Sequence, residues 1–257
     1  MKLRPIIKCQ GSKHHLTNWI IDYFPKDYEK MVYVEPFLGG GSVLLNKEPS
    51  VMEIANDSDA SIVAIMKSVR DEVDEFCKLL KKTRYTEGVF FGEMARQQAG
   101  LDQLEYAYNE FVVRKMSRGG MKKAFTSSKN TSATRENTSW KTTITSLPKI
   151  ATRIENVYLL NKNAVEVIAA FNSPDTLLYI DPPEIPSGTT PLGMDEMSTD
   201  QHADLIDLLL RFRGKVIVSG YSSTLYNRGL VGWRSFKVKN QDKTKPNKTE
   251  AVWLNYK

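Results

Sequence analysis

The sequence predicts an α/β protein built around a mostly parallel sheet. Residues 32–35, 51–57 and 177–180 are short apolar runs of strand-forming residues. Each run reaches an acidic side chain at its end: Glu35, Asp57 and Asp181. Segments with apolar residues three and four positions apart, the period of a helix, lie between these strands. Strands that alternate with helices in this way are typical of a parallel sheet.

The other segments fit the same architecture. Strands are predicted at residues 157–160 and 215–219, and a terminal hairpin is predicted at 233–239 and 251–256. Helices are predicted over residues 16–24, 43–45, 164–171 and 198–212, with several more between 61 and 114. The helix predicted at 198–212 begins with a capping box, in which Ser198 precedes Gln201 by three positions.

Composition narrows the class of protein. The 257 residues suffice for a full core, as one large domain or as a domain with an inserted subdomain. No apolar run reaches the roughly 18 residues that a membrane span needs, and the N-terminus has no signal-peptide pattern. Cys9 and Cys77 are too few for a disulfide framework, which fits a reducing cytoplasm. We therefore expect a cytoplasmic protein without a membrane partner.

Neither the metal-binding residue types nor the net charge identifies a ligand. No metal-ligand spacing connects the cysteines and histidines Cys9, Cys77, His14, His15 and His202. We therefore expect no metal. The net charge of +6 permits a polyanionic partner but does not prove one.

Asp181 is the strongest candidate for a residue that carries chemistry. In open α/β sheets, ligands bind beyond the carboxyl ends of the strands, and Asp181 stands at such an end. Pro182 and Pro183 follow, and because proline has a fixed φ and no N–H, they make a stiff turn with outward-facing carbonyls. A carboxylate beside rigid acceptors suits an amino group that must give up N–H hydrogens. A solvated strand exit is the alternative.

Glu35 and the glycines that follow it predict a cofactor site. Glycines at 39–41 let a ligand approach the backbone closely. The third glycine of the dinucleotide pattern G-x-G-x-x-G is missing, because Leu44 occupies its place. Glu35 would repel a pyrophosphate and attract a cation. This combination favours S-adenosylmethionine, which has an ammonium and a sulfonium centre, over NAD, and a glycine turn without a ligand is the alternative.

Asp57 ends the next predicted strand, about 20 residues after the first. At that spacing, nucleotide-binding βαβ units place a carboxylate on the ribose hydroxyls. We assign this role to Asp57 and the N-cap of the following helix to Asp59. A capping role for Asp57 is the alternative.

A basic segment runs from Arg114 to about Lys149, and its cations alternate with glycine and with many Ser, Thr and Asn residues. Such side chains suit phosphate contacts, and Arg and Asn can also read base edges. The predicted contacts to nucleic acid are Arg114, Lys115, Arg118, Lys122, Lys123 and Lys141. A solvated basic loop is the alternative.

The motifs follow one another in a specific order. They are Lys-x-x-Gly-Ser-Lys at 8–13, Glu-Pro-Phe-x-Gly-Gly-Gly at 35–41, Asn-Asp at 56–57, the basic segment, Asp-Pro-Pro at 181–183 and Ser-Gly-Tyr at 219–221. In this order, over nearly the whole chain, they resemble the Dam-like adenine-specific DNA methyltransferases. The resemblance implies the Rossmann-like fold of S-adenosylmethionine-dependent methyltransferases, a seven-stranded, mostly parallel sheet with a helical target-recognition insert. Residues 1–60 and 145–257 would form the catalytic domain, and 61–144 the insert that recognises DNA.

The resemblance also implies two sets of site residues. The S-adenosylmethionine site would be lined by Cys9, Lys13, Glu35, Phe37, Gly39, Asp57 and Asp181. The target amine would be held by Asp181, Pro182 and Pro183, with Glu184 beside them. Cys9 is a departure, because the family has an aromatic residue near the cofactor at that position.

Glu184 is the larger departure, because the family has a tyrosine after Asp-Pro-Pro. A carboxylate cannot stack on a flipped base, and stacking contributes about 1–3 kcal/mol per base, or about 10- to 100-fold in rate. On this account Glu184→Tyr raises the methylation rate by about one to two decades. The rival account is that Glu184 is an adapted residue that hydrogen-bonds a different substrate edge.

The activity implied by the resemblance is methyl transfer to adenine N6 in double-stranded DNA, by a monomer of a restriction–modification system or a phage. The adenine would be flipped out of the helix. Hydrogen bonds from its amine to Asp181 and to the Pro182 carbonyl would return electron density to the nitrogen. Two alternatives are a protein that binds cofactor and DNA but turns over slowly because of Glu184, and an enzyme acting on cytosine N4 or on RNA.

Overall fold

The structure, a computed structural model, describes residues 2–7, 13–126, 132–185, 197–239 and 248–257. Packing divides the chain into two compact units. The sheet unit consists of His15–Leu38, Lys47–Ser58 and Leu160–Lys257, and the helical unit consists of Met1–His14, Gly39–Asn46 and Asp59–Leu159. Compared with the expected division, the described residues 2–7, 13–14, 39–46, 59–60 and 145–159 belong to the helical unit.

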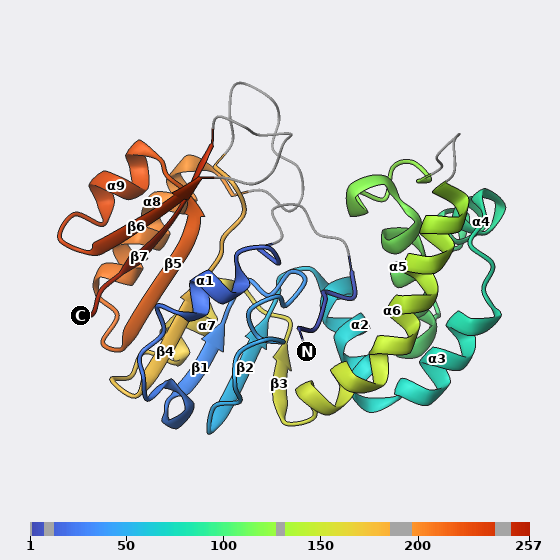
Figure 1. The fold of residues 1–257 in the computed structure, drawn as a ribbon, viewed down its shortest axis with the longest axis horizontal. Helices are drawn as coiled ribbons and strands as arrows, with labels where there is room; N and C mark the ends of the chain where they lie inside the picture. The colour runs from blue at the N-terminus through green and yellow to red at the C-terminus, as the bar shows by residue number, and fades with distance from the viewer. Residues whose placement is uncertain (1, 8–12, 127–131, 186–196, 240–247) are drawn as a thin grey trace. The chain divides into compact units, whose positions relative to one another are not determined.

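The described strands form one seven-stranded sheet in the order β3-β2-β1-β4-β5-β7-β6 (Figure 1). They are β1 (Val32–Glu35), β2 (Met52–Asn56), β3 (Val157–Leu160), β4 (Thr176–Ile180), β5 (Lys215–Tyr221), β6 (Arg234–Lys239) and β7 (Thr249–Leu254). Strand β1 pairs in parallel with β2 and β4, and β4 pairs in parallel with β5. Strand β7 is antiparallel to β5 and β6. The predicted seven-stranded, mostly parallel sheet with its terminal hairpin is confirmed.

One face of the sheet carries the apolar core of the sheet unit. Successive side chains of a strand point to opposite faces, so alternate residues of β1, β4 and β5 meet the same layer. This layer contains α7 (Ala164–Ala170), α8 (Thr199–Leu210) and α9 (Thr224–Gly229). The packed side chains include Val34, Leu178, Ile180, Val216, Val218, Ile168, Leu205, Leu209, Tyr226 and Trp253. Helix α8 begins at the predicted capping box, since Ser198 and Gln201 bond reciprocally.

The opposite face of β1, β4 and β5 is buried but partly polar. Tyr33 and Glu35 of β1, Tyr179 of β4 and Ser219 of β5 are all at most 2% exposed. Phe24 follows the short helix α1 (Thr17–Ile21), and its ring centroid lies 6.0 Å from that of Tyr33 and 6.3 Å from that of Tyr179. Apolar packing thus shields polar side chains that lead toward the carboxyl ends of the strands.

The helical unit packs α2 (Ala60–Asp71) against α5 (Gln103–Met116) and α6 (Ser132–Ile154). Two further helices, α3 (Val73–Lys82) and α4 (Glu87–Ala95), pack against α6 and α5 respectively (Figure 1). The predicted N-cap role of Asp59 is confirmed, because its side chain accepts a hydrogen bond from the Ser61 N–H. No helix among the described residues is both long enough and apolar enough to cross a bilayer.

One local prediction differs from the structure. The helix expected at residues 43–45 is a series of turns, in which the Asn46 side chain bonds the backbone of Leu3 and Ser42. These bonds offer the backbone an alternative to helix. The second half of the basic segment lies mostly in the helix α6, in which apolar residues recur at helical spacing and are buried. They are Trp140, Ile144, Leu147, Ile150 and Ile154.

Candidate active site

Asp181 directly follows β4 and is half-buried. The Ser219 hydroxyl donates a hydrogen bond to its Oδ1 over 3.0 Å. Ser219 also lies 2.8 Å from the phenol oxygen of Tyr179. The parallel register of β4 and β5 pairs Ile180 with Val218, so Asp181 and Ser219 occupy the next level of the two strands. The parallel pairing thus places a hydroxyl donor beside the predicted catalytic carboxylate.

Pro182, Pro183 and Glu184 are also half-buried. Glu184 accepts a hydrogen bond from Nζ of Lys248 at 2.8 Å, and the two form an ion pair. The same Nζ lies 4.5 Å from the centroid of the Tyr221 ring. Lys248 therefore connects the segment after β4 to the end of β5.

Lys248 was not predicted as a site residue, because the sequence showed it only in a lysine-rich loop. Its position follows from the direction of β7. Strand β7 is antiparallel to β5, and Glu250 pairs with Tyr221. The residue just before β7 therefore lies at the carboxyl end of β5, where ligands of parallel sheets bind. Only the register between β5 and β7 reveals the position of Lys248.

Glu35 ends β1 and is 2% exposed. The Tyr33 hydroxyl donates a hydrogen bond of 2.7 Å to its Oε2. Burial raises the pKa of Tyr33 well above its usual range, and the charge and hydrogen bond of Glu35 raise it further. Tyr33 therefore remains a donor over the whole neutral range and holds the Glu35 carboxylate in one orientation.

Asn56, the last residue of β2, is fully buried and ties together the segments that follow β1 and β3. Its Nδ2 donates to the carbonyls of Pro36 and Lys162 at 2.9 and 3.0 Å, and its Oδ1 accepts from the Lys162 N–H. Phe37 packs against the core of the sheet unit. Asp57 follows Asn56 and remains half-buried. The predicted ribose-binding carboxylate thus stands on a rigid turn.

The other predicted cofactor residues, Cys9, Lys13 and Gly39, lie outside the sheet unit or outside the described residues. Gly39 has a φ of +50°, and a Cβ atom added there would meet no atom within 4 Å. Lys13 is 6% exposed. Both belong to the helical unit, and Cys9 lies outside the described residues. The roles of these three residues in the cofactor site stay predictions.

Arg114 and Lys115 are buried, at 6% and 7% exposed. Arg114 donates to the Ser61 hydroxyl at 2.7 Å and forms ion pairs with Asp59 and Glu110. Burial raises the pKa of Asp59, but the Ser61 hydrogen bonds and the Arg114 charge outweigh it and lower that pKa overall. Buried side chains with these surroundings do not fit phosphate contacts, so we do not carry forward the predicted DNA contacts of Arg114 and Lys115.

Arg118 and Lys123 are exposed on a closed turn after α5. The turn is held by an isolated bridge between Ser117 and Phe125 and by the bond from the Arg118 N–H to the Ala124 carbonyl, 2.8 Å. Lys122 instead forms an ion pair with Glu110. Lys141 is exposed on α6. Arg118, Lys123 and Lys141 are therefore accessible to a polyanion.

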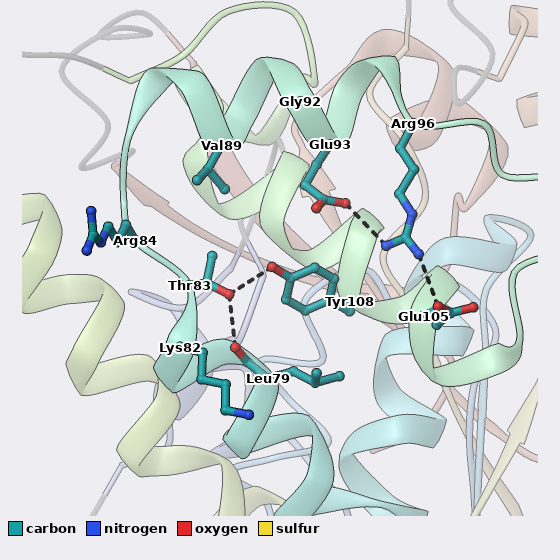
Figure 2. A pocket seen from close by; sticks show the side chains of 10 residues that line it. All are labelled: Leu79, Lys82, Thr83, Arg84, Val89, Gly92, Glu93, Arg96, Glu105 and Tyr108. Atoms are coloured by element: carbon teal, nitrogen blue, oxygen red, sulfur yellow. Dashed lines mark hydrogen bonds and ion pairs between the residues drawn. The ribbon is translucent and has the colours of Figure 1, made fainter.

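A pocket of about 550 Å³ lies in the helical unit between α3, α4 and α5 (Figure 2). Arg96 points between Glu93 and Glu105, at N–O distances of 3.7 and 3.1 Å (Figure 2). Thr83 and Tyr108 share a hydrogen bond of 2.8 Å across it. None of its lining residues is a predicted site residue, and its central charges satisfy one another. Within the described ranges, no group of three acidic, His or Cys side chains could hold a metal ion.

Comparison with known proteins identifies a family and a curated relative. A family model described as D12 class N6 adenine-specific DNA methyltransferase matches residues 10–245, a stretch that includes Glu35, Asp57 and Asp181. The chain is 30% identical over 90 residues to the Type II methyltransferase M.MjaIII of Methanocaldococcus jannaschii. That match covers 33% of this chain and 31% of the relative, so the chain spans about a third of the length of the relative it matches.

Proposed function

Since the chain belongs to the D12 class N6 adenine-specific DNA methyltransferase family, we propose that it transfers a methyl group from S-adenosylmethionine to adenine N6 in double-stranded DNA. Family membership implies a methyl donor and a DNA substrate. The observation that carries the proposal is Asp181, which stands at the end of a central parallel strand, is held by Ser219 and precedes two prolines. We further propose that the protein acts as a monomer in the cytoplasm.

The residues at the ends of β1 and β2 fit S-adenosylmethionine. Glu35 is a carboxylate fixed by Tyr33, and it suits the ammonium group of the cofactor. Asp57, on the turn that Asn56 holds, suits the ribose hydroxyls. When bound, S-adenosylmethionine supplies an electrophilic methyl group. Phe37 and Asp181 complete the set that we propose in the sheet unit.

Asp181 acts on the target amine. The lone pair of adenine N6 is delocalised into the ring, which makes the amine a poor nucleophile. Asp181 and the Pro182 carbonyl accept hydrogen bonds from the two N–H groups, and this returns electron density to the nitrogen. Asp181 polarises the amine before transfer and the proton leaves afterwards, so no base with a pKa near neutrality is needed. Ser219 keeps the carboxylate in the orientation that this step requires.

The amine is hidden inside duplex DNA, so we propose that the adenine leaves the helix, at a cost of a few kcal/mol. We assign the phosphate contacts to the exposed cations Arg118, Lys123 and Lys141. In this proposal residues 61–144 recognise the target sequence.

The deciding experiment is incubation with labelled S-adenosylmethionine and DNA of mixed sequence, followed by nucleoside analysis. We expect N6-methyladenine as the labelled product. Asp181→Ala should abolish its formation and change the affinity for the cofactor, measured by calorimetry, far less. Label on cytosine N4 would redirect the proposal to another base. Cofactor binding without any labelled nucleoside would support a protein that binds but does not turn over.

A further inference from the structure

We infer that Lys248 is a positioning residue of the proposed acceptor site at Asp181. It holds Glu184 and the Tyr221 ring together, where the resembling family has a tyrosine after Asp-Pro-Pro. The inference rests on the proposed function. It gives Lys248 a role in holding Glu184. On this account Glu184 is an adapted residue, and its presence does not impair methyl transfer.

The contacts of Lys248 carry the inference. Its Nζ is 2.8 Å from Oε2 of Glu184 and 4.5 Å from the centroid of Tyr221. One ammonium group therefore satisfies a carboxylate and covers an aromatic ring, an arrangement in which cation–π attraction adds to the ion pair. The side chains of Lys248 and Glu184 are 39% and 31% exposed, so a substrate can reach both.

All three residues belong to segments that meet at Asp181. Glu184 follows Asp181 by three positions. Tyr221 follows Ser219 by two positions on β5, and Ser219 donates to Asp181. Lys248 immediately precedes β7, whose Glu250 pairs with Tyr221. The group thus stands on the segments that adjoin Asp181 in the chain or in strand register.

Lys248 has an electrostatic task at this place. A second carboxylate near Asp181 would raise the pKa of both, because like charges disfavour ionisation. A protonated Asp181 would lose capacity to accept hydrogen bonds from the amine. The positive charge of Lys248 compensates that of Glu184 and so opposes any such rise in the pKa of Asp181.

The test is a double-mutant cycle on the methylation rate under single-turnover conditions. The variants are Lys248→Met, Glu184→Gln and the double change, with Lys248→Arg as the conservative variant and Lys237→Met, an exposed lysine of β6, as the matched control. We expect Lys248→Met to lower the rate by about threefold to fivefold at neutral pH, since pairs of this exposure are of modest strength. Lys248→Arg and Lys237→Met should stay within about twofold of the unchanged protein.

Two readouts separate this role from a structural one. The pH–rate profile of Lys248→Met should shift to higher pH, because the uncompensated Glu184 charge disfavours the ionised Asp181. The double variant should restore the profile and be no slower than Lys248→Met alone, because both charges are gone. Calorimetry should give the same cofactor affinity for all variants, which shows that the sheet unit remains folded.

Several outcomes overturn the inference. They are a Lys248→Met variant with unchanged rate and profile, additive losses in the double variant, or a tenfold gain from Glu184→Tyr alone, which would favour the impaired-stacking account. If Lys248→Met does not fold, the profile of Glu184→Gln decides. The inference requires it to shift to lower pH, because the uncompensated Lys248 charge then favours the ionised Asp181, and an unshifted profile overturns the inference. If the unchanged protein binds cofactor but forms no N6-methyladenine, the proposed function and this inference both fail. If it forms N6-methyladenine and Lys248 has no effect, only this inference fails.

Discussion

The Ser219 hydroxyl donates to Oδ1 of Asp181 at 3.0 Å. A serine has one hydroxyl proton, so Ser219 must accept the hydrogen bond that joins it to the Tyr179 phenol at 2.8 Å. Burial raises the pKa of Tyr179 well above its usual range, and the charge of Asp181 adds to the effect, so the phenol keeps its proton. A directed chain of hydrogen bonds, from Tyr179 to Ser219 and from Ser219 to Asp181, thus orients the Asp181 carboxylate.

Ser219→Ala should lower the rate of methyl transfer by about tenfold or more. A hydrogen bond to a charged group contributes about 1.5–3 kcal/mol, and 1.36 kcal/mol corresponds to a factor of ten. Single-turnover kinetics with saturating cofactor measure the effect. Tyr179→Phe serves as the matched variant and should lose less, because Ser219 keeps its bond to Asp181. Equal rates for Ser219→Ala and the unchanged protein would mean that Asp181 needs no such orientation.

The salt dependence of DNA binding should distinguish Lys123 from its neighbour. The log–log slope changes by about 0.9 for each neutralised phosphate. Lys123→Ala should therefore reduce the slope by about that amount, as should Arg118→Ala. Lys122→Ala should change the slope less, because Lys122 is paired with Glu110. Titrations of duplex DNA at several salt concentrations give the slopes. A salt-independent affinity would mean that the basic segment after Arg114 is a solvated surface without phosphate contacts.

Arg114→Met should destabilise the helical unit and leave the salt slope of DNA binding unchanged. Its removal takes the ion-paired guanidinium from Asp59 and leaves Glu110 with the ion pair to Lys122. Breaking a buried ion pair from one side costs about 3–5 kcal/mol. Urea unfolding measures the loss, with Lys123→Met as the exposed control expected to stay within about 0.5 kcal/mol. A stable Arg114→Met variant with a reduced salt slope would instead restore the phosphate-contact role.

Acid should destabilise the protein partly through His202. This residue is fully buried, its Nδ1 lies 2.9 Å from the Tyr226 hydroxyl, and burial lowers its pKa. The unfolded chain takes up a proton near pH 6.5, whereas the folded chain keeps His202 neutral to lower pH. The unfolded state then binds more protons, so the free energy of unfolding falls as pH drops below about 6.5 and levels off below the folded pKa.

Replacement of His202 isolates this contribution. His202→Gln should show a smaller loss of stability between pH 7 and pH 5, about the range in which the unfolded histidine titrates. His15→Gln changes an exposed histidine and is the matched control. Identical pH dependence in His202→Gln and the unchanged protein would show that other groups account for the acid sensitivity.

Much of the sheet and several helix starts follow from local sequence. The strands that end at Glu35 and near Asp181 were predicted because short apolar runs with a sharp polar end have few other structures available. The caps at Asp59 and Ser198 were predicted because a side chain and an N–H two or three residues later decide them. The helix expected at residues 43–45 failed where side-chain bonds of Asn46 to a distant backbone segment intervened.

The sequence by itself determined which segments become strands and which acids stand at their ends, because these depend on residues close together in the chain. The tertiary structure decided which charges meet. Arg114 belongs to a basic run in the sequence, yet helix packing buries it against Asp59. Lys248 belongs to a lysine-rich loop, yet the antiparallel register of β7 carries it to Glu184 and Tyr221. Arg114 and Asp59 are 55 positions apart in the chain, and Lys248 and Glu184 are 64 positions apart. Such contacts depend on packing and strand register, and no local pattern encodes them.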